Sequence, residues 1–189
     1  MRILALAALA AFPVQEEYFP LKEGTRWTYA VEDRAADAAA SASEVVSEVA
    51  GARAIGESEW TEVTRFLGYR SCWIRTTDAM IEMKAEATES APALPLLKLP
   101  AKAGDTWTGT LGREEVRFTV GSGEEVETAT SRVRALHVSF TVTAASKHEG
   151  HAATRGDLWF AAGTGIVRAQ VTKDLDCHSA ETKVYLLKH

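Results

Sequence analysis

Two short polar segments carry the residue types in this chain that could bind a metal ion or perform acid–base chemistry. The first is His148-Glu149-Gly150-His151, which places two imidazoles three positions apart beside a carboxylate. Such groups hold Zn²⁺ when a further ligand approaches them. The H-E-x-x-H spacing of helix-borne zinc sites is absent, and the surrounding residues are typical of a polar turn. We expect a solvated turn here, with a metal site at His148 and His151 as the alternative.

The second segment is Asp174-Leu175-Asp176-Cys177-His178, which groups two carboxylates, a thiol and an imidazole. In a reducing compartment, a Cys–His pair of this kind could supply a nucleophile. In an oxidising compartment, Cys177 would instead pair with Cys72, the other cysteine of the chain. Such a bridge would close a loop of about 105 residues and stabilise the fold by about 4–5 kcal/mol in the chain-entropy model. The sequence predicts a Cys72–Cys177 disulfide, with two separately buried thiols as the alternative.

Composition and glycine spacing argue against several other functions. The chain has 21 Lys and Arg against 26 Asp and Glu, a net charge of −5, and no basic stripe of the kind that binds nucleic acid. Gly163 and Gly165 lack the third glycine and the following helix of a dinucleotide-binding turn. We therefore predict no nucleic-acid partner, no cofactor, no metal ligand and no catalytic residue.

A nine-residue phrase occurs twice and predicts how the chain is organised. Residues 20–28 and residues 100–108 both read P-x-K-x-G-x-x-W-T. Proline and glycine shape a turn, and the Trp-Thr that follows opens a strand with a large apolar anchor, Trp27 in one copy and Trp107 in the other. Two strand starts built alike suggest two related β units.

Most of the remaining chain alternates between apolar and polar residues with the period of a strand. Residues 121–123 (GSG) are expected to form a turn, and His137 marks a change of phase where a bulge is expected. Residues 86–100 carry three prolines, so this stretch is a boundary rather than a regular central strand. The expected strands are 26–32, 44–50, 60–67, 71–76, 79–85, 106–111, 115–120, 131–144, 157–160, 166–171 and 182–187.

These strands predict an all-β, mainly antiparallel fold with about ten to twelve strands and little helix, because helix–strand alternation is absent. We expect a curved sheet that forms either a half-barrel or a two-sheet sandwich. Residues 16–189 are predicted to be a single domain, with 16–90 and 91–189 as two pseudo-repeated halves.

The N-terminus predicts export. Met1-Arg2 precedes the apolar run 3–12, which includes small residues at Ala8 and Ala10, as in a signal peptide cut between Ala10 and Gln15. The run is too short to span a bilayer. We predict a signal peptide over approximately residues 1–15, a periplasmic or secreted mature chain, and no membrane span within it; a frayed helix is the alternative.

Two segments resemble exported bacterial proteins of unknown function. Residues 18–29 (YFPLKEGTRWTY) are similar to the mature N-termini of those proteins, and residues 158–168 (LWFAAGTGIVR) are similar to a phrase near their ends. The resemblance implies an envelope domain with a curved half-barrel sheet. Some such sheets, like those of lipoprotein carriers, bind acyl chains. Many of these proteins carry a lipobox cysteine, which this sequence lacks, so the resemblance does not extend to a lipid anchor.

Two functional hypotheses follow. The first is a non-catalytic exported domain that binds a lipid or another apolar ligand, or an envelope protein partner, on its curved sheet. The second is a hydrolase or metal-dependent enzyme that uses His148 and His151, or Asp176 and His178. Five tryptophans lie in or beside the expected strands, where we expect them mainly to anchor the core.

Overall fold

A computed structural model describes residues 18–35, 41–143, 154–174 and 180–188. These residues form one antiparallel sheet of twelve strands and contain no helix. The strands are β1 (Arg26–Ala35), β2 (Ser41–Ile55), β3 (Ser58–Thr64), β4 (Ser71–Thr76), β5 (Met80–Lys84), β6 (Leu94–Lys98), β7 (Thr106–Leu111), β8 (Glu114–Glu127), β9 (Arg132–Thr143), β10 (Thr154–Ala161), β11 (Gly165–Asp174) and β12 (Ala180–Leu187).

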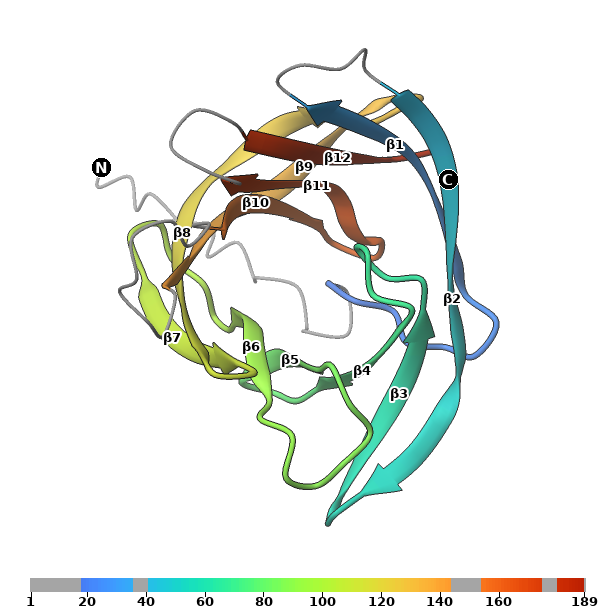
Figure 1. The fold of residues 1–189 in the computed structure, drawn as a ribbon, viewed down its shortest axis with the longest axis vertical. Helices are drawn as coiled ribbons and strands as arrows, with labels where there is room; N and C mark the ends of the chain where they lie inside the picture. Colours follow the sequence, from blue (N-terminus) through green and yellow to red (C-terminus); the bar gives the residue numbers. More distant parts are fainter. Residues whose placement is uncertain (1–17, 36–40, 144–153, 175–179, 189) are drawn as a thin grey trace, which may run out of the picture.

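The sheet consists of two six-stranded meanders joined through one ladder. Its order is β6-β5-β4-β3-β2-β1-β12-β11-β10-β9-β8-β7, so β1 pairs with β12 and every other ladder joins strands consecutive in the chain. Seen in Figure 1, the strands curl into a nearly closed ring in which β6 and β7, the two edges, lie close together. The predicted all-β antiparallel fold is confirmed, and its curved single sheet bends almost to a barrel.

The first copy of the repeated phrase forms a corner that ties the start of β1 to β2. The Gly24 N–H donates to the Val49 carbonyl at 2.9 Å, and the Val49 N–H donates to the Thr25 carbonyl at 2.9 Å. A turn bond from the Thr25 N–H to the Lys22 carbonyl (3.0 Å) completes the corner. Gly24 has a φ of 80°, a left-handed conformation that favours glycine.

The second copy repeats this pattern bond for bond. The Gly104 N–H donates to the Val120 carbonyl (2.8 Å), the Val120 N–H donates to the Asp105 carbonyl (2.9 Å), and the Asp105 N–H donates to the Lys102 carbonyl (3.0 Å). Gly104 has a φ of 91°. The two phrases therefore share a backbone shape as well as a spelling, and each begins one of the two meanders. Common descent of the two halves stays a prediction.

The seam between β6 and β7 is closed by side chains. The indole N–H of Trp107 on β7 donates to the carbonyl of Pro95 on β6 at 2.8 Å. Pro95 has no N–H to offer a ladder, which confines it to a sheet edge. Gly109 allows the strands to approach, because a Cβ there would lie 2.6 Å from the Cδ of Pro95. The stretch expected to be a boundary thus contains a short edge strand.

The prediction of a turn at residues 121–123 is wrong, because these residues lie within β8. β8 continues through these residues without reversing, and a bulge between Val120 and Gly123 shifts its register against β9. The bulge places Gly121 against the His137 ring: a Cβ on Gly121 would lie 2.6 Å from His137 Nδ1. Gly121 therefore leaves room for the imidazole of His137 and does not form part of a chain reversal. The bulge expected near His137 does exist, but its extra residues belong to the partner strand.

Candidate functional site

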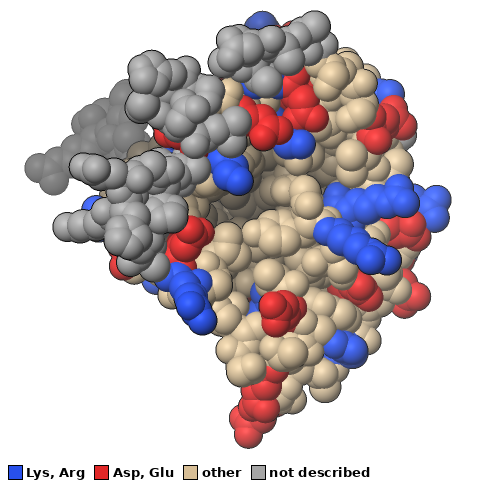
Figure 2. All heavy atoms as spheres, in the orientation of Figure 1, with Lys and Arg blue, Asp and Glu red and all other residues tan. Residues whose placement is uncertain are grey.

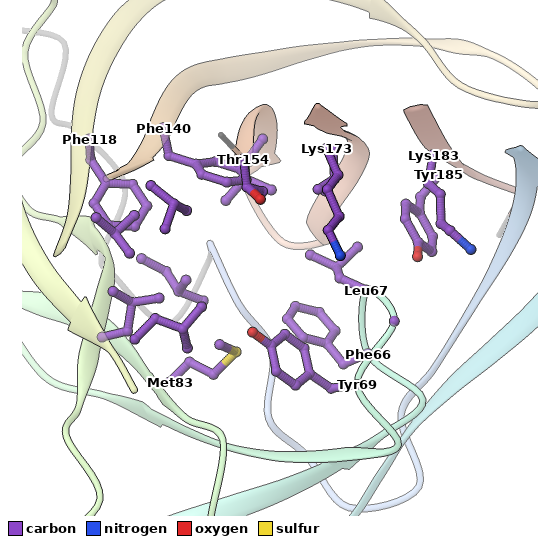
Figure 3. Close-up of a pocket in the computed structure, with 18 of the residues that line it drawn as sticks. Phe66, Leu67, Tyr69, Met83, Phe118, Phe140, Thr154, Lys173, Lys183 and Tyr185 are labelled. Atoms are coloured by element: carbon purple, nitrogen blue, oxygen red, sulfur yellow. The ribbon is translucent and has the colours of Figure 1, made fainter. Parts of the chain in front are cut away.

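The curled sheet encloses a cavity of about 580 Å³. Its wall is mostly aliphatic and aromatic, with contributions from both meanders (Figure 3), including Phe66, Met83, Leu96, Phe118, Phe140 and Leu158. Its volume lies within the range of pockets that enclose small organic ligands. Figure 2 shows the molecule hollowed near its centre, with basic and acidic side chains around the edge of the hollow.

Strand alternation explains why the cavity is apolar. Successive side chains of a strand point to opposite faces, so every second residue faces the lumen. On β8 these are Val116 and Phe118, and on β9 they are Phe140 and Val142. The residue between the two on β9, Thr141, is exposed. The lumen is therefore lined by the inward half of an ordinary amphipathic pattern.

The connection between β3 and β4 enters the barrel and forms part of the cavity wall (Figure 1). Arg65 and Leu67 have φ values of 52° and 45°, a left-handed backbone that is costly for residues with a side chain. The connection is held by the hydroxyl of Ser47, which donates to the Arg65 carbonyl at 2.9 Å. Inside the barrel, Phe66 packs edge-on against Phe19, with 5.7 Å between the ring centroids. This strained connection thus presents apolar side chains to the lumen.

One end of the cavity is polar. Strands β10, β11 and β12 contribute the polar lining at this end: Thr154, Lys173, Glu181, Lys183 and Tyr185. Figure 3 shows the side chains of Lys173, Lys183 and Tyr185 reaching toward the space that the apolar residues enclose. The cavity therefore joins an apolar interior to a hydrogen-bonding, charged end.

The charge of Lys183 is already balanced within the protein. Its ammonium nitrogen lies 3.2 Å from a carboxylate oxygen of Asp33 and 3.7 Å from one of Glu181. The hydrogen bond to Asp33 raises the pKa of Lys183, against the opposing effect of burial. Burial raises the pKa of the Tyr185 hydroxyl, which remains a neutral hydrogen-bonding group at neutral pH.

The described residues hold no candidate metal centre: no group of three His, Cys, Asp or Glu side chains among them could hold a metal ion. His148 and His151, together with Asp176, Cys177 and His178, lie outside the described residues, so the metal and hydrolase hypotheses on these side chains are untested.

One His–Asp pair that the sequence analysis missed lies within the sheet. Nε2 of His137 lies 2.7 Å from Oδ1 of Asp157, and the imidazole stacks on Trp159 with 5.0 Å between ring centroids. In the described part of the chain, no hydroxyl or thiol hydrogen-bonds to this imidazole, so the pair lacks the nucleophile of a catalytic triad. The pair is a cross-strand contact between β9 and β10.

The predicted Cys72–Cys177 disulfide is not supported. Cys72 is a free, fully buried thiol on β4, and its Sγ lies 3.7 Å from the Val63 carbonyl oxygen. Burial, with a smaller contribution from Glu62, raises the pKa of Cys72 to about 12. In this position, cysteine acts as a small apolar core residue. Its expected partner, Cys177, lies outside the described residues.

We expect Cys72 to resist alkylation while the protein is folded, because the reactive thiolate is scarce when the pKa is about 12 and the sulfur is buried. In the variant Cys177→Ser, iodoacetamide at pH 8 should leave Cys72 unmodified by mass spectrometry and should modify it fully after unfolding in urea. Rapid modification of the folded variant would contradict the burial of this thiol.

The five tryptophans are buried: Trp27, Trp60, Trp73, Trp107 and Trp159. They anchor packing as expected, and the cavity wall is built from other residues. The residues of the cavity wall occupy inward-facing positions of the strands. The sequence identifies such positions as apolar but does not show whether they line a cavity or fill a core.

Comparison with known proteins gives two structural similarities. No protein-family model matches the chain, and no curated protein matches it significantly. A predicted exported protein with a YmcC-like fold from Bacteroides fragilis superposes with a TM-score of 0.50 at 16% identity, over 91% of this chain and 99% of that one. The fold is YmcC-like. A predicted lipoprotein from Parabacteroides distasonis has a TM-score of 0.45 at 12% identity, over 90% of this chain and 97% of that one.

Proposed function

We propose that this protein is a non-catalytic exported domain that binds an apolar ligand inside its barrel. The observation that carries the proposal is the cavity of about 580 Å³ with a mostly apolar wall. Cavities of this kind, with a few polar groups at one point, are the usual form of small-molecule sites. Protein interiors are normally close-packed, with few voids larger than a water molecule. An unfilled space inside the barrel is therefore an exception, which a ligand would explain.

The proposed location follows from the sequence and agrees with a structural relative. The basic start and apolar run of residues 1–12 are typical of a signal peptide. The Bacteroides fragilis protein with the same fold is described as exported. The part of this chain that the structure describes holds no helix long and apolar enough to cross a bilayer.

An apolar ligand is a better-supported occupant than a protein partner. The cavity is concave, and side chains from both meanders line it, whereas a protein would need a broad exposed surface. No contact among the described residues favours hydrolysis, because His137, the described imidazole with a carboxylate partner, has no nucleophile beside it.

The test is binding of the apolar fluorophore N-phenyl-1-naphthylamine, whose emission rises when it leaves water. We expect saturable binding to the unaltered protein. Val142 faces the lumen and is buried, so Val142→Trp should fill part of the cavity and weaken binding about tenfold or more. Thr141→Trp, one residue away on the exposed face of β9, is the matched control and should bind like the unaltered protein.

Urea unfolding of each variant checks that it still folds cooperatively. Absence of saturable binding to the unaltered protein would refute the proposal. Equal binding by the Val142→Trp and Thr141→Trp variants, both folded, would place any binding site outside the lumen.

A further inference from the structure

Lys173 is a solvent-exposed lysine at the polar end of the cavity, and Glu181 on β12 is one of its cross-strand neighbours. It lies on β11 two residues after Val171, on the same face of the strand, and both residues line the cavity. In the described part of the chain, no carboxylate lies within ion-pair distance of its ammonium group. This contrasts with Lys183, which Asp33 and Glu181 already neutralise.

Three hydroxyl groups that line the same cavity have no hydrogen-bond partner among the described residues. Thr154 is the cross-strand neighbour of Lys173, and the two side chains point into the same space (Figure 3). Tyr185 and Tyr69 also line the cavity, and burial raises the pKa of both phenols, which keeps them protonated. Among the described residues, none of these three hydroxyls makes a hydrogen bond. They are therefore available to a molecule in the cavity.

The rest of the cavity offers only apolar contacts. Phe118, Phe140 and Leu158 form part of the apolar wall. Leu67, from the strained β3–β4 connection, lies below the ammonium of Lys173 in Figure 3. An occupant that satisfies both regions has an apolar body and one negatively charged end.

We propose that the lumen selects single-chain amphiphiles with an anionic head group, and that Lys173 binds the head group while Thr154 and Tyr185 donate hydrogen bonds to it. The alkyl chain of the ligand then lies against the apolar wall. A charge-assisted hydrogen bond is stronger than one between neutral groups. This inference rests on the proposed function, because it specifies the ligand of the same cavity.

The experiment measures displacement of N-phenyl-1-naphthylamine by decanoate, decyl phosphate, decanol and decyltrimethylammonium, each below the concentration at which it forms micelles. We expect both anions to bind about tenfold more tightly than decanol, and the cation more weakly still. The tighter of the two anions identifies whether a carboxylate or a phosphate head group is preferred.

Lys173→Met should abolish the preference for the anions while leaving the affinity for decanol unchanged. Lys173→Arg should restore most of the preference, because it restores the charge. Lys98→Met is the matched control: Lys98 is an exposed lysine of β6 that does not line the cavity, and this variant should keep the full preference.

The outcomes separate the two levels of the argument. If decanol and the anions bind the unaltered protein equally, the head-group inference is wrong and the proposed apolar site stands. If the preference survives in the Lys173→Met variant, Lys173 is not the head-group residue. If none of the four compounds displaces the fluorophore and the fluorophore itself does not bind, the proposed function fails.

Discussion

Replacing Trp107 by alanine is expected to lower the free energy of unfolding by about 3–5 kcal/mol, the usual cost of truncating a buried aromatic side chain. The indole stacks on Phe118 with 5.4 Å between ring centroids, and its N–H donates to the Pro95 carbonyl across the seam. Among the described residues, no backbone ladder joins β6 to β7. The contact between these two edges therefore depends more on the Trp107 side chain than the contact between two hydrogen-bonded strands depends on any one side chain. Urea unfolding followed by circular dichroism measures the loss.

The variant Trp107→Phe separates packing from the hydrogen bond. Phenylalanine retains the ring that stacks on Phe118 but leaves the Pro95 carbonyl without its donor, and we expect a loss of about 1–2 kcal/mol. If the alanine variant is as stable as the unaltered protein, the seam is held by other contacts. If the phenylalanine variant loses as much as the alanine variant, the hydrogen bond rather than the stacking closes the barrel.

Gly156→Ala is the second substitution with a large expected effect. A Cβ at position 156 on β10 would lie 2.3 Å from the backbone oxygen of Gln170 and 2.7 Å from two ring carbons of Phe140. The Gln170 oxygen belongs to the neighbouring strand β11, so relief requires the two strands to move apart. We expect the free energy of unfolding to fall by about 3 kcal/mol, at the upper end of the cost of overpacking a core.

Gly123→Ala is the matched control for this substitution. Gly123 also lies in a strand, but the nearest atom to its hypothetical Cβ is an Arg134 side-chain nitrogen at 3.6 Å, an ordinary contact. Its stability should change by no more than about 0.5 kcal/mol, as for most surface substitutions. Equal stabilities of the two variants in thermal unfolding would show that the β10–β11 spacing adapts without cost.

Much of the fold was predictable because strands alternate and turns have their own residue types. The expected strands 71–76 and 106–111 coincide with β4 and β7 as the structure has them. The two repeated corners could be recognised from the sequence repeat, because the geometry of each corner favours a glycine in the left-handed conformation and a buried tryptophan. Closure of the sheet was not predictable in the same way, because it depends on which two edges meet in space.

The candidate site was missed for a local reason. The strand expected at 166–171 ends before Lys173, but β11 continues to Asp174 and thereby carries Lys173 into the lumen. In the same way, β12 begins at Ala180 rather than at residue 182, which brings Glu181 into the sheet. Threonine and charged residues blur strand ends in a sequence, because they are common both at strand ends and in loops.

The disulfide prediction is not supported, because Cys72 is a free thiol in the structure and Cys177 lies outside the described residues. Two cysteines in an exported chain suggest a bridge. Cys72 and Trp73 are consecutive residues of β4, so their side chains point to opposite faces. The thiol packs in the main core, and the indole packs in a separate, smaller cluster. A thiol at such a position contributes as an apolar group whether or not a partner exists.

The pairing of β1 with β12 gives the molecule an unusual connectivity. Ten of the eleven ladders form between strands that follow one another, and the remaining one joins residues such as Asp33 and Lys183, which are 150 positions apart. Read from β7 through β12 and then from β1 to β6, the same sheet would be a plain up-and-down array with every partner local. In the natural order, the pairing of the first strand with the last therefore carries most of the loop-closure entropy of folding. The pairings within each meander join strands that are close in sequence, and such local pairings form faster.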